Sequence, residues 1–419
     1  MHKLIYIILA SGLTAGYWHF AGVESASRAR TRTTPEAQTQ TVVTATTAFL
    51  NLLSAEERQN VLFPFTPQKT ATAATFKRAG MGGPGGPPTM PRDTAGRGQG
   101  QAPRGRPGGG PGGRPGGPGS PGGGGGKGGF AGFVGEQYGQ AVWSNFPVSD
   151  VPRPGLQMGK LTAPQRGAAL HLLEVLLSPK GYQKVLDIMG SDQVLSEGGT
   201  NYASGTAYYT LGIFGSPSAT TPWMVQFGGH HLGLNVVIAG QHGVLTPTLT
   251  GAQPALYTKD GKTVRVLAQE NDKAFDLLNA LTETQRKQAI LNYQIGDLVL
   301  GPGQAGKIIV PEGLKASAMN ASQRTILLDL IVQWAGIIND AYVTARLAEI
   351  KAGLDETYFA WSGPTTHEPG KNGAAYYRIQ GPKVIIEFSP QGVGGDLTMH
   401  IHTVYRDPTN EYGHTFTVK

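Results

Sequence analysis

A helix-start pattern recurs four times along the chain. In each case Ser, Thr or Asn follows an apolar residue and precedes Glu or Gln by three positions. The four pairs are Ser54 and Glu57, Thr162 and Gln165, Thr282 and Gln285, and Asn320 and Gln323. This is the spacing of a capping box, in which each side chain bonds the backbone N–H of the other residue. The apolar stripes at 170–177 and 326–338 then predict amphipathic helices.

Strand patterns gather in two blocks. The predicted strands are 207–214, 223–227 and 232–238 in the first block, and 376–380, 383–388 and 399–405 in the second. Helical and strand segments are segregated rather than alternating, which favours an α+β fold with an antiparallel or mixed sheet. Each block has an aromatic-led strand, a Gly-containing corner and an apolar strand, which is compatible with a weak internal duplication.

The N-terminus has the pattern of an export signal. His2 and Lys3 precede an apolar run that continues to Trp18, and small residues follow at 25–27. We therefore predict a signal peptide over 1–27, with an uncleaved anchor as the alternative, and no transmembrane span after its removal. Residues 28–41 are polar and are expected to be a disordered lead-in. The mature protein is expected to be periplasmic or secreted.

Glycine and proline are concentrated in one window. The sequence has 62 Gly and 29 Pro, and most residues in 80–129 are one or the other, without a Gly-X-Y period. We interpret 80–129 as a disordered insertion in a single large domain over 42–419. Most of the formal charge of +7 also lies in this window. The rest of the chain therefore has no basic footprint that would predict specific nucleic-acid binding.

The sequence contains no cysteine, which excludes disulfides, thiolate catalysis and cysteine-ligated metals. It also lacks the G-x-S-x-G, H-E-x-x-H and phosphate-loop motifs in a strand–helix context. The sequence therefore indicates no known catalytic-nucleophile or nucleotide-binding motif, and histidine is the remaining candidate for a functional site.

Four of the ten histidines form two close groups. His400 and His402 flank one residue of a predicted strand, so their side chains lie on the same face and can bind one ion. In the other group, strand parity places His231 with Gly233 and Asn235. His231 is therefore the third predicted ligand, and His230 is an outer or packing residue unless the preceding glycines let both rings turn inward. Three imidazoles are typical of a zinc or copper site with an open coordination position.

Three charged residues lie near these strands in the sequence. Glu387 interrupts an apolar strand, and its predicted role is a fourth ligand, a general base or an acceptor that orients an imidazole. Arg406 suits a substrate carboxylate or phosphate. Asp407 either contributes to the site or is only the ion-pair partner of Arg406.

An ordered set of motifs resembles a bacterial family known as domain of unknown function thirty-five hundred. The motifs are Trp143–Pro147, Phe214–Pro217, Trp223, Gly229–Leu232, Leu234–Asn235, Tyr377–Pro382, Glu387, His400–His402, Tyr405–Asn410 and Tyr412–Gly413. The resemblance runs from about Thr41 to Gly413, and the 80–129 window looks like an insertion peculiar to this member. It implies that the four histidines, Glu387, Arg406 and Asp407 form one site, and it supplies no substrate.

Three classes of function follow from these patterns. The leading hypothesis is an exported metal-dependent enzyme, hydrolytic or oxidative, acting on a small or anionic substrate. In an oxidative copper site, Tyr377 and Tyr405 would be candidates for the surroundings. The second class is a non-catalytic metal- or ligand-binding envelope protein. The third is an interaction protein that contacts the envelope through 80–129.

Overall fold

All four predicted capping boxes are present at helix starts. Thr162, for example, accepts a hydrogen bond from Gln165 N, while the Gln165 side chain accepts one from Thr162 N. The computed structural model describes residues 33–77, 132–307 and 309–417, and the described residues from Thr34 onward cluster as one compact unit. The predicted signal peptide and the whole 80–129 insertion lie outside the described residues. No helix in the described ranges has the length and hydropathy needed to cross a bilayer.

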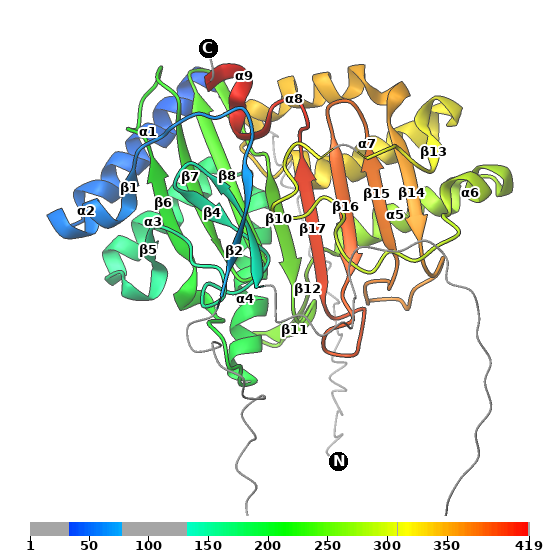
Figure 1. The fold of residues 1–419 in the computed structure, drawn as a ribbon, viewed down its shortest axis with the longest axis horizontal. Coiled ribbons are helices and arrows are strands. Elements are labelled where there is room, and N and C mark those ends of the chain that lie inside the picture. The colour runs from blue at the N-terminus through cyan, green and yellow to red at the C-terminus, as the bar shows by residue number, and fades with distance from the viewer. Residues whose placement is uncertain (1–32, 78–131, 308, 418–419) are drawn as a thin grey trace, which may run out of the picture. The chain divides into compact units, whose positions relative to one another are not determined.

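Helices and sheets pack together as an α+β fold, which confirms the predicted class (Figure 1). The helices are α1 (Pro35–Asn51), α2 (Ala55–Val61), α3 (Ala163–Leu176), α4 (Pro179–Glu197), α5 (Ala268–Ala280), α6 (Glu283–Ala289), α7 (Ala321–Ala335), α8 (Asp340–Ala352) and α9 (His414–Thr417).

The expectation of a disordered lead-in over 28–41 is wrong from Pro35 onward, where α1 begins. Thr34 caps this helix by accepting a hydrogen bond from Ala37 N, and proline occupies the first helical position. Both features favour a helix start. The polar composition of 28–41 hides this start because the apolar stripe of α1, at Val42, Ala45 and Phe49, comes later.

The strands form one large sheet and two small ones. They are β1 (Leu62–Phe63), β2 (Thr72–Phe76), β3 (Phe133–Tyr138), β4 (Ala141–Trp143), β5 (Leu156–Gln157), β6 (Thr210–Phe214), β7 (Trp223–Gly229), β8 (Leu232–Ala239), β9 (His242–Val244), β10 (Thr248–Ala252), β11 (Leu256–Lys259), β12 (Lys262–Arg265), β13 (Leu314–Lys315), β14 (Tyr358–Ser362), β15 (Tyr376–Gln380), β16 (Ile385–Pro390) and β17 (Ile401–Arg406). The main path of the large sheet is β1-β6-β7-β8-β10-β17-β16-β15-β14-β13, with antiparallel pairs except β1–β6.

The two faces of the large sheet differ in chemistry. One face is apolar and packs on the helices; Phe227, Ile386 and Tyr405 belong to this core. The opposite face carries buried polar side chains. They include Gln226, Asn235, Arg378, Glu387, His402 and Arg406. Figure 1 shows the small sheet β2–β3–β4 in front of the β6–β8 part of the large sheet. The candidate site residues are therefore held in a covered, polar layer.

The strand order shows an internal duplication. The series β5-β6-β7-β8-β10 and β13-β14-β15-β16-β17 have the same pairing pattern, and they meet where β10 pairs with β17. Each half also begins with a short strand, a 3-10 turn and two consecutive helices, α3–α4 in one and α7–α8 in the other. Leu177, which directly follows α3, forms a β-bridge with Ile338, which follows α7.

The capping-box side chains also pair across these helix starts. The Gln323 amide bonds the Gln285 amide, with Nε2–Oε1 distances of 2.9 and 3.1 Å. In the other half, Gln165 Nε2 lies 3.1 Å from Glu57 Oε2. The side chains that cap these helices therefore also join α2 to α3 and α6 to α7.

Replacing Gln323 tests this second role. Gln323 is buried and also donates to Ala280 O at 2.8 Å, so Gln323→Ala leaves several buried groups unpaired. We expect a loss of about 1–3 kcal/mol in the free energy of unfolding, measured by urea denaturation. The control is the exposed Thr325→Ala on the same helix, with an expected change within ~0.5 kcal/mol. Equal effects of the two substitutions would contradict the pairing.

Candidate metal centre

The turn between β7 and β8 consists of His230 and His231. The backbone of His231 is left-handed, with φ of 60°, which is uncommon for a residue with a side chain. The two rings stack with centroids 3.7 Å apart, and both are buried. Both rings are therefore held inside the protein at this corner.

His400 and His402 lie at the start of β17, beside this turn. His400 Nε2 is 3.0 Å from His231 Nε2 and 3.1 Å from His402 Nε2. The predicted grouping of His231, His400 and His402 is therefore present, with one nitrogen of each ring within 4.8 Å of the others. Three nitrogens bound to one zinc ion at ~2.0–2.1 Å would lie roughly 2.9–3.4 Å apart. The two spacings from His400 fall in this range, whereas His231 and His402 lie farther from each other and would have to approach to share an ion with it.

The proton positions on His400 follow from its neighbours. Its Nδ1 lies 3.1 Å from Val393 O, a carbonyl that can only accept a hydrogen bond. In the neutral ring, Nδ1 therefore carries the proton and Nε2 carries a lone pair. That one lone pair faces two other ring nitrogens, although it can accept only one N–H.

Burial keeps the rings of His231 and His400 uncharged. Burial and the adjacent His402 ring lower the pKa of His400 to about 3. Burial, followed by the nearby His230, His400 and His402, holds the pKa of His231 well below its ordinary value. Neutral imidazoles are the form that binds metals, so the environment prepares these rings as ligands.

His230 occupies the outer position that parity allows. Its Nδ1 is 2.8 Å from Asp192 Oδ1 on α4, and its carbonyl accepts a hydrogen bond from Tyr209 at 2.9 Å. The buried Arg153 donates to Gly229 O at 3.2 Å, just before the turn. These contacts fix the turn from the helical side, so His230 supports the ring of His231 by stacking.

Gly251 on β10 makes room for the His231 ring. It pairs with His402 in the sheet register. A Cβ atom at this position would lie 2.6 Å from Ile401 O, 3.3 Å from His231 Cβ and 3.5 Å from its Cδ2. The absence of a side chain therefore lets the His231 ring approach β17.

Glu387 lies on the same face of the sheet as His402, but its carboxylate serves another contact. It accepts hydrogen bonds from Val299 N at 3.0 Å, from Leu300 N at 2.7 Å and from the Tyr376 hydroxyl. In the register Glu387 faces Val404, and Ser389 faces His402. The structure therefore places Glu387 beside the 299–300 backbone, two residues along β16 from the position that faces His402.

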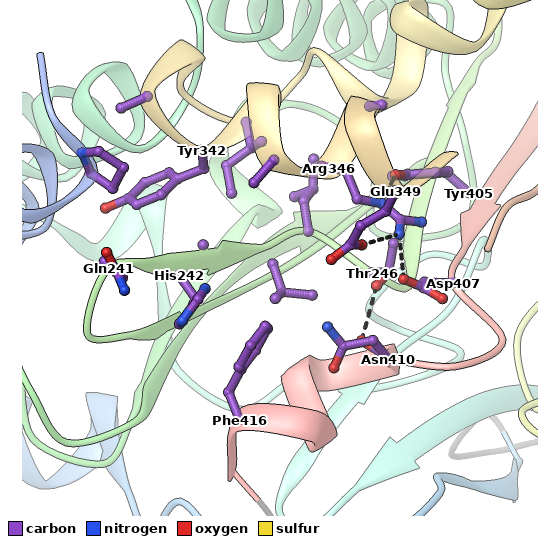
Figure 2. Close-up of a pocket in the computed structure, with 18 residues that line it drawn as sticks. Gln241, His242, Thr246, Tyr342, Arg346, Glu349, Tyr405, Asp407, Asn410 and Phe416 are labelled. Carbon is purple, nitrogen blue, oxygen red and sulfur yellow. Dashed lines mark hydrogen bonds and ion pairs between the residues drawn. The ribbon is translucent and has the colours of Figure 1, made fainter. Parts of the chain in front are cut away.

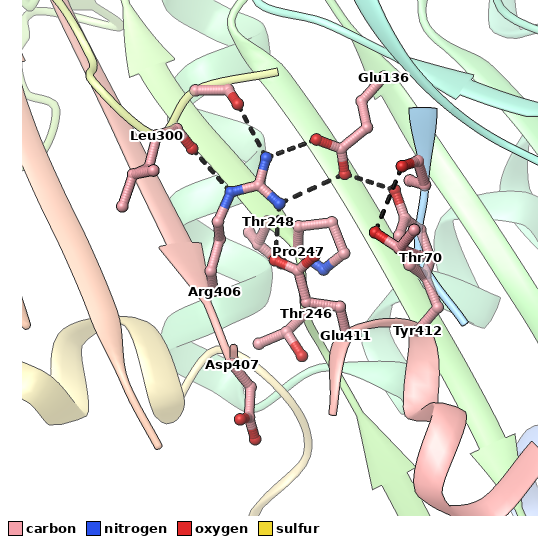
Figure 3. Close-up of polar contacts among 12 residues, drawn as sticks. Thr70, Glu136, Thr246, Pro247, Thr248, Leu300, Arg406, Asp407, Glu411 and Tyr412 are labelled. Carbon is pink, nitrogen blue, oxygen red and sulfur yellow. Dashed lines mark hydrogen bonds and ion pairs between the residues drawn. The ribbon is translucent and has the colours of Figure 1, made fainter. Parts of the chain in front are cut away.

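Arg406 is four residues from His402 on β17, about 13 Å at the usual strand rise. Figure 3 shows its guanidinium enclosed by partners. It forms ion pairs with Glu136 at 2.5 Å and Glu411 at 2.6 Å, and it donates to Leu300 O at 2.7 Å. The structure thus places Arg406 in a buried ion-pair network, where its donors already have protein partners.

Asp407 belongs to a different group. Its carboxylate pairs with Arg346 of α8 at 2.5 Å, beside a cavity of about 80 Å³ (Figure 2). It also accepts hydrogen bonds from Thr409 N and Oγ1. The alternative of an Arg406–Asp407 ion pair is replaced by these two separate pairings, Arg406 with two glutamates and Asp407 with Arg346.

Two residues that the sequence analysis did not select lie next to His402. Asp297 Oδ1 is 3.5 Å from His402 Nδ1, and Asn145 Nδ2 is 3.4 Å from the same atom. Asn145 lies in the Trp143–Pro147 motif, which was the available signal. Asp297 lies in an irregular loop, and no pattern in its neighbourhood indicates a site.

These features define an α+β protein with a buried three-histidine cluster on the polar face of a duplicated sheet. The chain belongs to the family described as Protein of unknown function (DUF3500), whose model matches residues 133–414. All the histidines of the cluster lie within that range. Neither a curated protein nor a solved structure matches the chain.

Gly251→Ala tests the packing of the cluster. The added Cβ displaces either β17 or the His231 ring, so we expect metal affinity to fall at least roughly tenfold, measured by chelator competition. Gly167→Ala on α3 is the control, because nothing lies within 4 Å of its added Cβ. Unchanged affinity in Gly251→Ala would show that His231 is not a ligand.

Proposed function

We propose that this protein is a metal-dependent enzyme in which His231, His400 and His402 bind one zinc or copper ion. The observation that carries the proposal is the His400 Nε2 lone pair, which faces the Nε2 atoms of both other rings at 3.0 and 3.1 Å. A bound cation would satisfy all three nitrogens at once. A proton is a poor substitute, because the pKa of His400 is lowered to about 3.

The surroundings of the cluster favour hydrolytic chemistry over oxidative chemistry. Three neutral nitrogen ligands leave a position for water, and a zinc ion in such a set lowers the pKa of that water to about 7. Tyr377 and Tyr405, the candidates for an oxidative site, belong to the opposite, helix-packed face. Their hydroxyls contact Glu270 O and Arg346.

The cluster also lies close to solvent. His402 is buried, whereas the side chain of Asp297, its neighbour, retains 60% of its exposure. A substrate approaching from this side would meet the Asp297 carboxylate, which lies across the His402 ring from the nitrogen that faces the cluster. We place the proposed enzyme in an exported protein, on the strength of the N-terminal pattern and the cysteine-free sequence.

Metal analysis of the purified, untagged protein tests the proposal. We expect about one equivalent of zinc or copper by mass spectrometry, and loss of most of it in His231→Ala and in His400→Ala. The control is His242→Ala, because His242 is an exposed histidine on β9. A folded wild-type protein that binds neither metal, even after addition of each, would contradict the proposal.

A second measurement separates an enzyme from a closed metal carrier. The Co²⁺-substituted protein is titrated with azide while its visible absorption spectrum is recorded. An open coordination position predicts a saturable spectral change, because azide replaces water on the ion. A spectrum that azide leaves unchanged would favour the non-catalytic metal-binding class.

A further inference from the structure

The segment 297–303 crosses the polar face of the sheet without forming a helix or strand. Buried charged side chains hold its backbone at five points. The contacts are Val299 N to Glu387 Oε1 (3.0 Å), Leu300 N to Glu387 Oε2 (2.7 Å), Arg406 Nε to Leu300 O (2.7 Å), Arg406 Nη2 to Gly301 O (2.8 Å) and Gly303 N to Glu136 Oε2 (3.0 Å).

These three side chains are almost completely removed from solvent. Glu136 and Glu387 are 0% exposed and Arg406 is 2% exposed. Burying a charge is costly unless it is paired and hydrogen-bonded, so the backbone groups of 297–303 are needed to satisfy these side chains. The dependence is mutual, because an irregular segment has no internal partners for its own N–H and C=O groups.

The start of the same segment carries Asp297. Its Oδ1 accepts hydrogen bonds from Leu298 N at 2.7 Å and from Gln391 Nε2 at 3.0 Å, and it faces His402 Nδ1 at 3.5 Å. The next side chain, Leu298, packs against a small buried cluster that contains Trp143 and Val404. Asp297 is therefore fixed on the protein side although it is exposed to solvent.

We infer that Asp297 is the outer carboxylate partner of the metal ligand His402, and that Glu387 and Arg406 are positioning residues that act through the 297–303 segment. This inference rests on the proposed function. A carboxylate at Nδ1–H keeps the Nε2 lone pair directed at the ion and raises the basicity of the imidazole, and such partners contribute 10- to 100-fold in metal affinity.

Glu387 and Arg406, which sequence patterns placed in the site and the structure places beside it, thereby share one role. Glu387 and Arg406 bond consecutive residues of one segment, Val299, Leu300 and Gly301. Asp297 lies two residues before Val299, where these contacts begin. Glu387 and Arg406 therefore affect the centre without touching the ion or a substrate.

A double-mutant cycle on the full-length protein tests this inference. Zinc dissociation constants are measured by chelator competition for wild type, Asp297→Asn, Glu387→Gln and the double variant. We expect Asp297→Asn to weaken binding roughly 10- to 100-fold. Glu387→Gln should also weaken binding in the wild-type background, and it should add little once Asp297 is replaced, because it acts through Asp297.

Glu312→Gln is the matched control, because Glu312 pairs with Arg378 on the same face and makes no contact with the 297–303 segment among the hydrogen bonds of the described residues. Its zinc affinity should equal that of wild type. The Co²⁺ spectrum gives a second readout: Glu387→Gln should reproduce the spectrum of Asp297→Asn. If Glu387→Gln does not fold, Gln391→Met, which removes another donor to Asp297 Oδ1, replaces it in the cycle.

Two outcomes would overturn the inference. Wild-type affinity in Asp297→Asn would remove Asp297 from the centre, and fully additive effects would remove the coupling to Glu387. Both leave the proposed function intact, because the wild-type protein still binds zinc through its histidines. A wild-type protein that binds neither zinc nor copper would instead contradict the proposed function itself.

Discussion

The hydrogen bond from His400 Nδ1 to Val393 O is the contact on which the three-histidine cluster depends. It directs the opposite nitrogen, with its single lone pair, at the rings of His231 and His402. Three neutral imidazoles buried around one point are unfavourable by themselves, since their lone pairs cannot all find a proton. The same arrangement is favourable around a cation, which supports the proposed metal centre.

The duplicated sheet explains why this centre lies where it does. Its two halves meet at the β10–β17 pair, and the cluster forms at the end of this seam from β17 and the β7–β8 turn. Gly251 opens the space between them. The apolar face of the sheet is occupied by helices, so the polar face is free to carry ionised groups, each satisfied by a loop or by another charge.

Local patterns in the sequence were sufficient for part of this structure. Capping boxes such as Thr162–Gln165 need only neighbouring residues, and strand parity correctly put His400 and His402 on one face. His231 is the third ring of the cluster, as predicted, but it lies in the β7–β8 turn and not on a strand, so parity is not the reason for its position. Pairings between residues far apart in the sequence could not be predicted from these local patterns. Arg406 pairs with Glu136, which is 270 residues away in the sequence. Asp297 lies beside His402 only because side chains of two strands hold an irregular segment across the sheet. The start of α1 was missed because its cap lies in a polar stretch.

The most direct test of the central claim is X-ray absorption spectroscopy of the protein loaded with one equivalent of zinc. The account predicts three imidazole nitrogens at ~2.0–2.1 Å from the ion, completed by a light atom such as a water oxygen. In His400→Ala the imidazole count should fall. A zinc environment without imidazole, or one unchanged in His400→Ala, would contradict the three-histidine centre.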